Sequence, residues 1–173
     1  MAKITDLQVD RFRLPLPEPI EASAAGVMSA FDMVASSITD SDGVTGVGYT
    51  VCHAGQGGSI ASILDRAFRE IMMGEDPDLI EGLWRRMYKA CHYAGRGGPV
   101  SFALAAADVA LWDMKGRRLG QPLWRLMGGA QRKVKAYAGN IDLNFPVEKL
   151  VAGGLASVDA GFHSGKMRFG RPT

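Results

Sequence analysis

Apolar and polar residues nearly alternate between Leu7 and Leu14, a pattern that predicts a half-buried β-strand. Two further runs rich in β-forming residues, 31–39 and 44–52, follow it along the chain. The turn between them, 40–43, holds Asp and Gly residues that favour a hairpin. The three segments together predict a three-stranded antiparallel meander.

Two segments beside these strands are predicted to be loops. Residues 15–30 combine prolines and small residues with little periodicity, and residues 53–58 are rich in glycine. Long loops in compact domains are more often functional than idle, so both segments are candidate lids over a substrate. Glu21 and His53 are their candidate substrate-binding residues. His53 also fits an ordinary structural histidine, because no Asp, Glu or Cys lies near it at metal-ligand spacing.

Helical spacing dominates the next part of the chain. Apolar residues recur every three or four positions over 60–71, a helix that Ser59 can cap and that is expected to stop near Gly74. A second helix is predicted to open at Pro77, a residue suited to a first turn. The third, 101–115, is rich in alanine, which lets a neighbouring helix or sheet approach closely. Strands followed by helices indicate an α+β domain.

The pattern changes towards the end of the sequence. Residues 133–138 and 166–169 are predicted to be strands, and residues 146–160 between them are predicted to be a helix. Such a β-α-β unit is typical of parallel sheets with helical crossovers. One unit has too few strands to close a barrel, so we expect this part of the sequence to be incomplete as a fold.

Composition and charge describe a soluble globular protein. Hydrophobic residues make up 47% of the 173 residues, and 20 basic against 18 acidic residues give a net charge of +2. This balance gives no electrostatic reason to expect nucleic acid or a membrane as a partner. Cys52 and Cys91 lie far apart without CxxC spacing, and no signal-peptide pattern opens the chain. We therefore expect free thiols and a cytoplasmic location.

A specific resemblance is carried by the segment 107–129. It reads ADVALWDMKGR at 107–117, LGQPL at 119–123 and LMGG at 126–129. This segment resembles the signature helix of the mandelate racemase and muconate lactonizing enzyme group of the enolase superfamily. The resemblance implies that residues 1–129 are the N-terminal capping domain, with a three-stranded meander and helices. It also implies that residues 130–173 are the first strands and helix of a modified TIM barrel of roughly 250 residues.

One acidic residue of this segment needs a partner if the helix packs inward. Asp108 stands among Ala, Leu and Trp residues. We expect it to be largely buried with a hydrogen-bonding or basic partner, because an isolated buried charge is costly.

The resemblance also points to two catalytic residues, Lys166 and Arg168. In the family, the end of the second barrel strand carries a Lys-x-Lys pair, and the enolase superfamily is known to combine a Lys or His base with Mg²⁺. Residues two apart on a strand face the same side, so both should face the barrel interior. Arg168 replaces the second lysine and stays protonated. We expect the pair to stabilise carboxylate and enolate oxygens, while a histidine on a later strand takes the proton.

The function implied is removal of a proton beside a carboxylate. A single base favours dehydration of an acid sugar, the work of a lyase, over racemisation, which needs bases on both faces. A racemase, epimerase or cycloisomerase of the same superfamily is the alternative. Mg²⁺ is the expected cofactor, with ligands expected beyond Thr173 and none in this chain. The expected substrate is a small carboxylate, either an acid sugar or a related 2-hydroxy acid.

A different class of function stays open. The 173 residues could act as a non-catalytic truncated capping module that folds or oligomerises without chemistry. Exposed strand edges and apolar faces in the β-α-β unit would then need cover. The expected cover is another copy of the chain or the remainder of the barrel.

Overall fold

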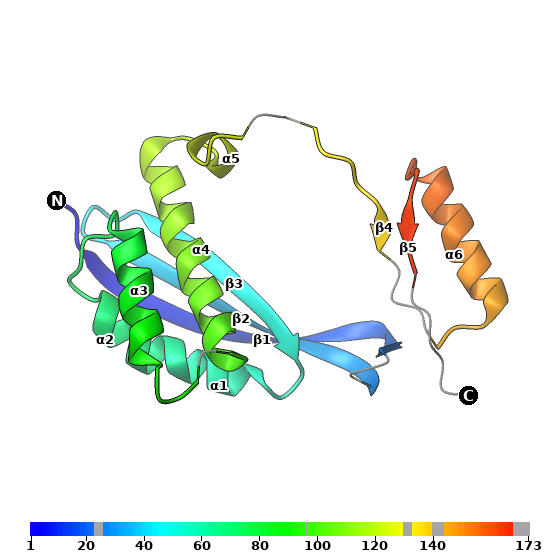
Figure 1. The fold of residues 1–173 in the computed structure, drawn as a ribbon, viewed down its shortest axis with the longest axis horizontal. Helices are drawn as coiled ribbons and strands as arrows, with labels where there is room; N and C mark the ends of the chain where they lie inside the picture. The colour runs from blue at the N-terminus through cyan, green and yellow to red at the C-terminus, as the bar shows by residue number, and fades with distance from the viewer. Residues whose placement is uncertain (23–25, 96, 130–132, 140–143, 168–173) are drawn as a thin grey trace. The chain divides into compact units, whose positions relative to one another are not determined.

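The computed structural model describes the chain except residues 23–25, 96, 130–132, 140–143 and 168–173. It falls into two compact units, which are Met1–Leu14 with Phe31–Gly129, and Pro15–Ala30 with Ala130–Thr173. The elements are β1 (Ile4–Ala22), β2 (Gly26–Asp40), β3 (Thr45–His53), α1 (Gly57–Ser62), the π-helix η1 (Ile63–Phe68), α2 (Arg69–Met72), α3 (Ile80–Ala90), α4 (Pro99–Leu119), α5 (Leu123–Leu126), β4 (Ala138–Gly139), α6 (Val147–Asp159) and β5 (Gly165–Lys166) (Figure 1).

The first unit is a helix-covered sheet. Its three strands run in the order β1-β2-β3, and β2 pairs antiparallel with β3 in a register that places Ala35 opposite Tyr49. Burial alternates along β2, with Val34 and Ile38 fully buried. Helix α4 lies across the sheet against β3 (Figure 1). The predicted α+β fold with a three-stranded meander is confirmed.

The prediction that residues 15–30 form a loop was wrong, because the described part of this segment lies in β1 and β2. Prolines are tolerated in an edge strand when their nitrogens face away from the neighbouring strand. β1 is an edge strand, and Pro15, Pro17 and Pro19 stand at alternate positions, so their nitrogens point to one side. Strand continuation is therefore compatible with all three prolines.

Strand β3 packs directly on the backbone of α4, as the alanine-rich sequence of that helix predicts. A Cβ atom placed on Gly48 would stand 2.1 Å from the carbonyl oxygen of Ala106, and one on Gly46 would stand 2.2 Å from that of Ala110. The buried hydroxyl of Ser36 donates to the Ala106 carbonyl at 3.0 Å. Glycine is required here because any side chain would force the helix away from the sheet.

Two helices begin at other residues than the sequence predicts. Helix α1 begins at Gly57, and the Ser59 hydroxyl donates to the Gln56 carbonyl at 2.8 Å inside the first turn, so Ser59 is not the cap. Helix α3 begins at Ile80 rather than at Pro77. The predicted stop near Gly74 agrees with its φ of 76°.

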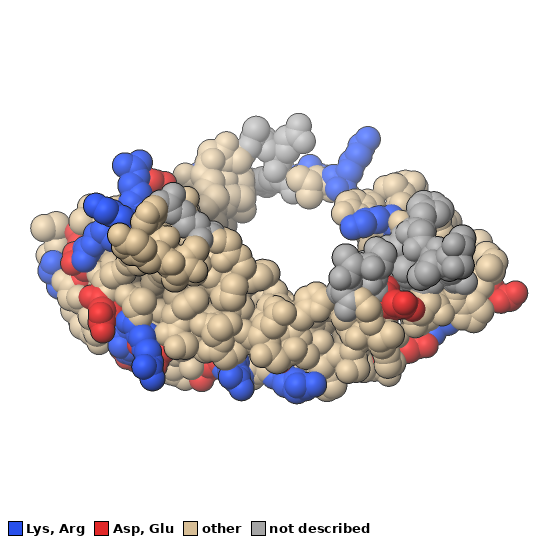
Figure 2. Space-filling view, turned by 60° about the horizontal axis from the view of Figure 1, so that its bottom comes forward, with Lys and Arg blue, Asp and Glu red and all other residues tan. Residues whose placement is uncertain are grey.

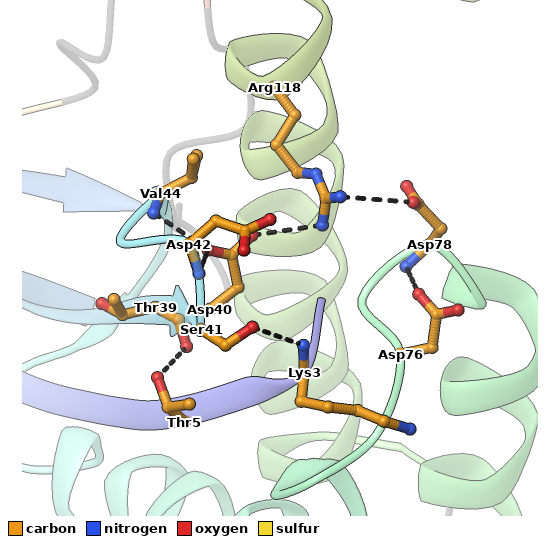
Figure 3. A network of polar contacts seen from close by, with 10 residues as sticks. All are labelled: Lys3, Thr5, Thr39, Asp40, Ser41, Asp42, Val44, Asp76, Asp78 and Arg118. Atoms are coloured by element: carbon orange, nitrogen blue, oxygen red, sulfur yellow. Dashed lines mark hydrogen bonds and ion pairs between the residues drawn. The ribbon is translucent and has the colours of Figure 1, made fainter. Parts of the chain in front are cut away.

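A buried carboxylate ties together one end of the first unit (Figure 3). Asp40 accepts hydrogen bonds from the N–H groups of Asp42 at 3.0 Å and Val44 at 2.9 Å, which shapes the β2–β3 turn. Its second oxygen lies 3.1 Å from an Arg118 nitrogen near the end of α4. Arg118 lies 3.9 Å from Asp78 as well. Asp40 and Arg118 thus join the β2–β3 turn, the end of α4 and the turn that precedes α3.

The second unit contains the β-α-β arrangement. Strands β4 and β5 are parallel, with Ala138 opposite Gly165 and Gly139 opposite Lys166. Helix α6 connects them, as predicted, but the strands are shorter than the predicted ranges 133–138 and 166–169 in their described parts. The end of the β1–β2 hairpin clusters with this unit.

The surface agrees with a near-neutral charge. On the face shown in Figure 2, Lys and Arg side chains stand among Asp and Glu side chains. Within the described ranges, no helix combines the length and apolarity needed to cross a membrane. Both cysteines, Cys52 and Cys91, are buried free thiols.

Candidate active site

Lys166 lies at the carboxyl end of β5, directly opposite Gly139 of β4. Parallel strands end at the same edge of a sheet, and catalytic residues of barrels gather at that edge. The Lys166 side chain is exposed. Arg168 lies outside the described residues, so its orientation beside Lys166 stays a prediction.

Glu21 lies in β1, within the same compact unit as Lys166. Its backbone N–H donates to the Asn144 Oδ1 atom at 3.0 Å, and the Asn144 Nδ2 group donates to the Pro19 carbonyl at 3.3 Å. Lys149 of α6 forms an ion pair with Glu18. These three contacts hold β1 against Asn144 and the first turn of α6.

His53 belongs to the other compact unit, at the end of β3. It is exposed, and its ring meets that of Phe31 edge-on with centroids 6.5 Å apart. Its carbonyl accepts a hydrogen bond from Gln56 at 3.1 Å. The structure therefore gathers Glu21 and Lys166 in one unit and leaves His53 in the other.

The glycine-rich loop after His53 is organised by Asp32, a residue that the sequence analysis missed. The Asp32 Oδ2 atom accepts from the N–H groups of Gly55 at 2.8 Å and Gly57 at 3.1 Å. Asp32 is 7% exposed. Burial, and then the charge of Asp32, raise the pKa of the Cys52 thiol, which keeps this thiol protonated and unreactive.

Asn144 is the second residue that the sequence analysis missed. Its partners stand more than 120 positions earlier in the chain, at |i−j| of 123 and 125. An Asn before a predicted helix reads as ordinary loop chemistry. No local signal could have connected it with Glu21.

A cavity of about 430 Å³ lies between α6 and the two short strands, lined by Ser157, Val158, Phe162 and His163 among others. Neither Lys166 nor Glu21 lines it. This cavity therefore does not bring the described candidate residues together.

Metal ligands are a separate question. Among the residues that the structure describes, no three His, Cys, Asp or Glu side chains gather closely enough to hold a metal ion. The Glu18 carboxylate forms an ion pair with Lys149. The described residues therefore do not form a Mg²⁺ site by themselves.

The sequence is similar to a known protein family and to several known proteins. The family described as "Mandelate racemase / muconate lactonizing enzyme, N-terminal domain" matches residues 5–128. The chain is 41% identical over 169 residues to 3,6-anhydro-alpha-L-galactonate cycloisomerase of Streptomyces coelicolor, covering 98% of this chain and 47% of the relative. It is 33% identical over 141 residues to arabinonate dehydratase of Saccharolobus solfataricus, covering 80% of this chain and 38% of the relative.

Solved structures give the same grouping. A racemase from Streptomyces coelicolor with bound magnesium superposes with a TM-score of 0.95 at 41% identity, covering 98% of this chain and 48% of that chain. L-talarate/galactarate dehydratase from Salmonella typhimurium, liganded with Mg and L-lyxarohydroxamate, superposes with a TM-score of 0.90 at 25% identity, covering 99% and 45%. The chain spans about half the length of the relatives it matches, or less.

Proposed function

Because the chain belongs to the mandelate racemase / muconate lactonizing enzyme family, we propose that it is the N-terminal part of a Mg²⁺-dependent acid-sugar dehydratase. Residues 1–129 would be the capping domain and residues 130–173 the start of the barrel. The observation that carries the proposal is the place of Lys166, at the carboxyl end of a strand in a parallel β-α-β unit. Relatives named as dehydratases support the choice of reaction.

The reaction is an elimination beside a carboxylate. A base removes the proton at C2, the electron pair of that bond forms a C2=C3 double bond, and the C3–O bond breaks as the hydroxyl group leaves with a proton. The enol product then becomes a 2-keto-3-deoxy acid. Negative charge grows on the carboxylate oxygens before the C–O bond breaks, so fixed positive charge aimed at those oxygens lowers the barrier.

Lys166 and Arg168 supply that charge in this proposal. Arg168 cannot act as a base, because a guanidinium group stays protonated at ordinary pH. The proton acceptor would be a histidine outside the described residues. A bound Mg²⁺ supplies further charge stabilisation to the substrate carboxylate, and magnesium stands in the structures of two relatives. We propose that its ligands lie outside the described residues.

The test uses the complete gene product with a panel of aldonic and aldaric acids, Mg²⁺ and D₂O. We expect a 2-keto-3-deoxy acid by NMR. Lys166→Met should lower kcat/KM by about 10²–10³, the loss typical of one oxyanion-stabilising group. Lys135→Met, which removes another exposed lysine before β4, serves as the matched control. Full activity of the Lys166 variant would reject the proposed role.

A cycloisomerase is the second candidate. The relative that is 41% identical over 98% of this chain carries that name. In a 3,6-anhydro acid, the oxygen that leaves C3 stays attached at C6. The same elimination then opens a ring and releases no water. Mass spectrometry separates the two reactions, because a dehydratase product is lighter than its substrate by one water and a cycloisomerase product has the same mass.

The alternative is a non-catalytic capping module, and experiments on the complete gene product also test it. If the complete gene product binds no Mg²⁺ by calorimetry and turns over no acid, the enzymatic proposal fails and a folding or oligomerising role replaces it. The proposal places the enzyme in the cytoplasm, supported by two buried free thiols. It also takes another copy of the chain as a partner.

A further inference from the structure

The outer edge of β1 carries few hydrogen-bond donors. Backbone groups of alternate residues in a strand point to the same side, so Pro15, Pro17, Pro19 and Glu21 share one side of β1. The first three have no N–H group. The Glu21 N–H group donates to the Asn144 side chain, which identifies this side as the free edge. Glu21 thus holds the first N–H group on that edge after Pro15.

Asn144 binds this edge as another strand would. Its carboxamide accepts from Glu21 N–H at 3.0 Å and donates to the Pro19 carbonyl at 3.3 Å. These are the two backbone groups that a neighbouring strand would use in one step of a ladder. The contact thus specifies the register of β1 relative to Asn144. A shift of β1 by one residue would turn the N–H and carbonyl groups at these positions to the other side of the strand.

A charged contact supports the same docking. Lys149 pairs with Glu18 from the first turns of α6, and its Nζ atom lies 3.8 Å from the centre of the Phe145 ring. Lys149 and Glu18 are both about half exposed, at 44% and 53%. Exposed ion pairs contribute little by themselves. The directional hydrogen bonds of Asn144 therefore determine the position of the strand.

The Glu21 carboxylate stays available for a ligand. Its residue is half-buried, and within the described part of the chain its carboxylate makes no hydrogen bond or ion pair. A carboxylate repels the carboxylate of a substrate, so the groups that it can bind are hydroxyls, as hydrogen-bond donors. Whether the Glu21 carboxylate can reach such a hydroxyl group depends on the position of the β1 backbone.

We propose that Asn144 is a positioning residue that fixes Glu21 for binding substrate hydroxyl groups. This inference rests on the proposed function for its substrate, and on the two hydrogen bonds of Asn144 for its geometry. Asn144→Leu keeps the size of the side chain and removes both hydrogen bonds. Asn144→Asp keeps an acceptor for Glu21 N–H and loses the donor to Pro19.

The first measurement is amide hydrogen exchange in the complete gene product without substrate. Asn144→Leu should speed exchange at Glu21 N–H by about tenfold, the effect of about one hydrogen bond, and leave Ile20 N–H, which points to the other side, unchanged. Asn144→Asp should preserve most of the protection. Gln121→Leu, which removes an exposed carboxamide from the loop after α4, should change neither. Unchanged exchange at Glu21 in Asn144→Leu would overturn the inference.

The second measurement is steady-state kinetics with a double-mutant cycle. Asn144→Leu should raise KM about tenfold with kcat changed less than about twofold, and should have no further effect on KM when Glu21→Gln is already present. A merely structural role predicts additive effects and would also overturn the inference. Exchange is measured without turnover, so loss of Glu21 protection in a protein that turns over no acid sugar counts against the proposed function alone.

Discussion

Single buried polar residues organise the backbone in this protein. Asp32, Ser36 and Asp40 are the buried polar residues of the described chain, and each one contacts backbone groups of another segment. Such groups are stable inside a protein only when their hydrogen bonds are made. Asp32 and Asp40 therefore stabilise turns, and Ser36 stabilises the contact between the sheet and α4.

Asp108 behaves differently. The expectation of a largely buried carboxylate with a partner was wrong, because Asp108 is half-buried and no described residue forms a hydrogen bond or ion pair with it. Burial, and secondly the charge of Glu81, raise the pKa of Asp108 above the ordinary 3.8. The folded state thus holds the Asp108 proton more tightly than the unfolded chain does.

The pH dependence of stability tests this reading of Asp108. Because its folded pKa is raised, stability is full below the ordinary value of 3.8 and falls as pH rises through the folded value. Asp108→Asn should therefore gain stability relative to the natural protein over that window and keep the gain at neutral pH. Urea unfolding at a series of pH values measures it. Parallel curves for the two proteins would contradict the raised pKa, and Glu81→Gln should give a smaller change of the same sign.

At the scale of elements, the contact between β3 and α4 holds the first unit together. It depends on the absence of side chains at Gly46 and Gly48. Backbone atoms form the opposing surface, and they cannot move aside as a flexible side chain could. The sheet and the helix consequently meet at a distance that only glycine permits.

Gly48→Ala should destabilise the protein by about 3 kcal/mol, the upper range for overpacking, because the added Cβ would stand 2.1 Å from the Ala106 carbonyl oxygen. The matched control is Gly82→Ala near the start of α3, where the new atom meets only the Leu79 Cβ at 3.9 Å. That change should stabilise by about 0.5–1 kcal/mol through helix propensity. Urea midpoints that shift in the same direction for both variants would reject the packing argument.

At the scale of the whole molecule, the second unit leaves apolar side chains in water. Helix α6 presents a stripe at helical spacing, and the strand segments add further exposed residues. These residues are Val134, Tyr137, Val147, Val151, Leu155, Val158 and Met167. The apolar side of α6 thus lacks cover within the described residues. Phe169 lies outside the described residues.

The 173-residue chain on its own should self-associate, because contiguous exposed apolar surface favours contact with another chain. Light scattering measures the mass, and Val151→Gln with Leu155→Gln should shift the population towards monomer. Exposed Val109→Gln on α4 of the first unit is the control and should leave the mass unchanged. A monodisperse monomer of the natural chain, with its α6 amides protected from exchange, would contradict this prediction.

The sequence by itself determined the elements whose signal is local. Alternation, helical spacing and glycine stops identified the meander, the long helix α4 and the β-α-β order, and the segment 107–129 was enough for the family. Local signals succeed here because a face buried along one element repeats at that element's own period.

Only the tertiary structure decided how distant segments meet. Three prolines predicted a loop, yet an edge position makes them compatible with β1. Asp32 and Asn144 bind backbone groups 23 or more positions away, and no pattern along the chain records such a pairing. The reason is physical: a hydrogen bond between remote segments depends on where packing brings them, while periodicity reports only which side of an element is buried.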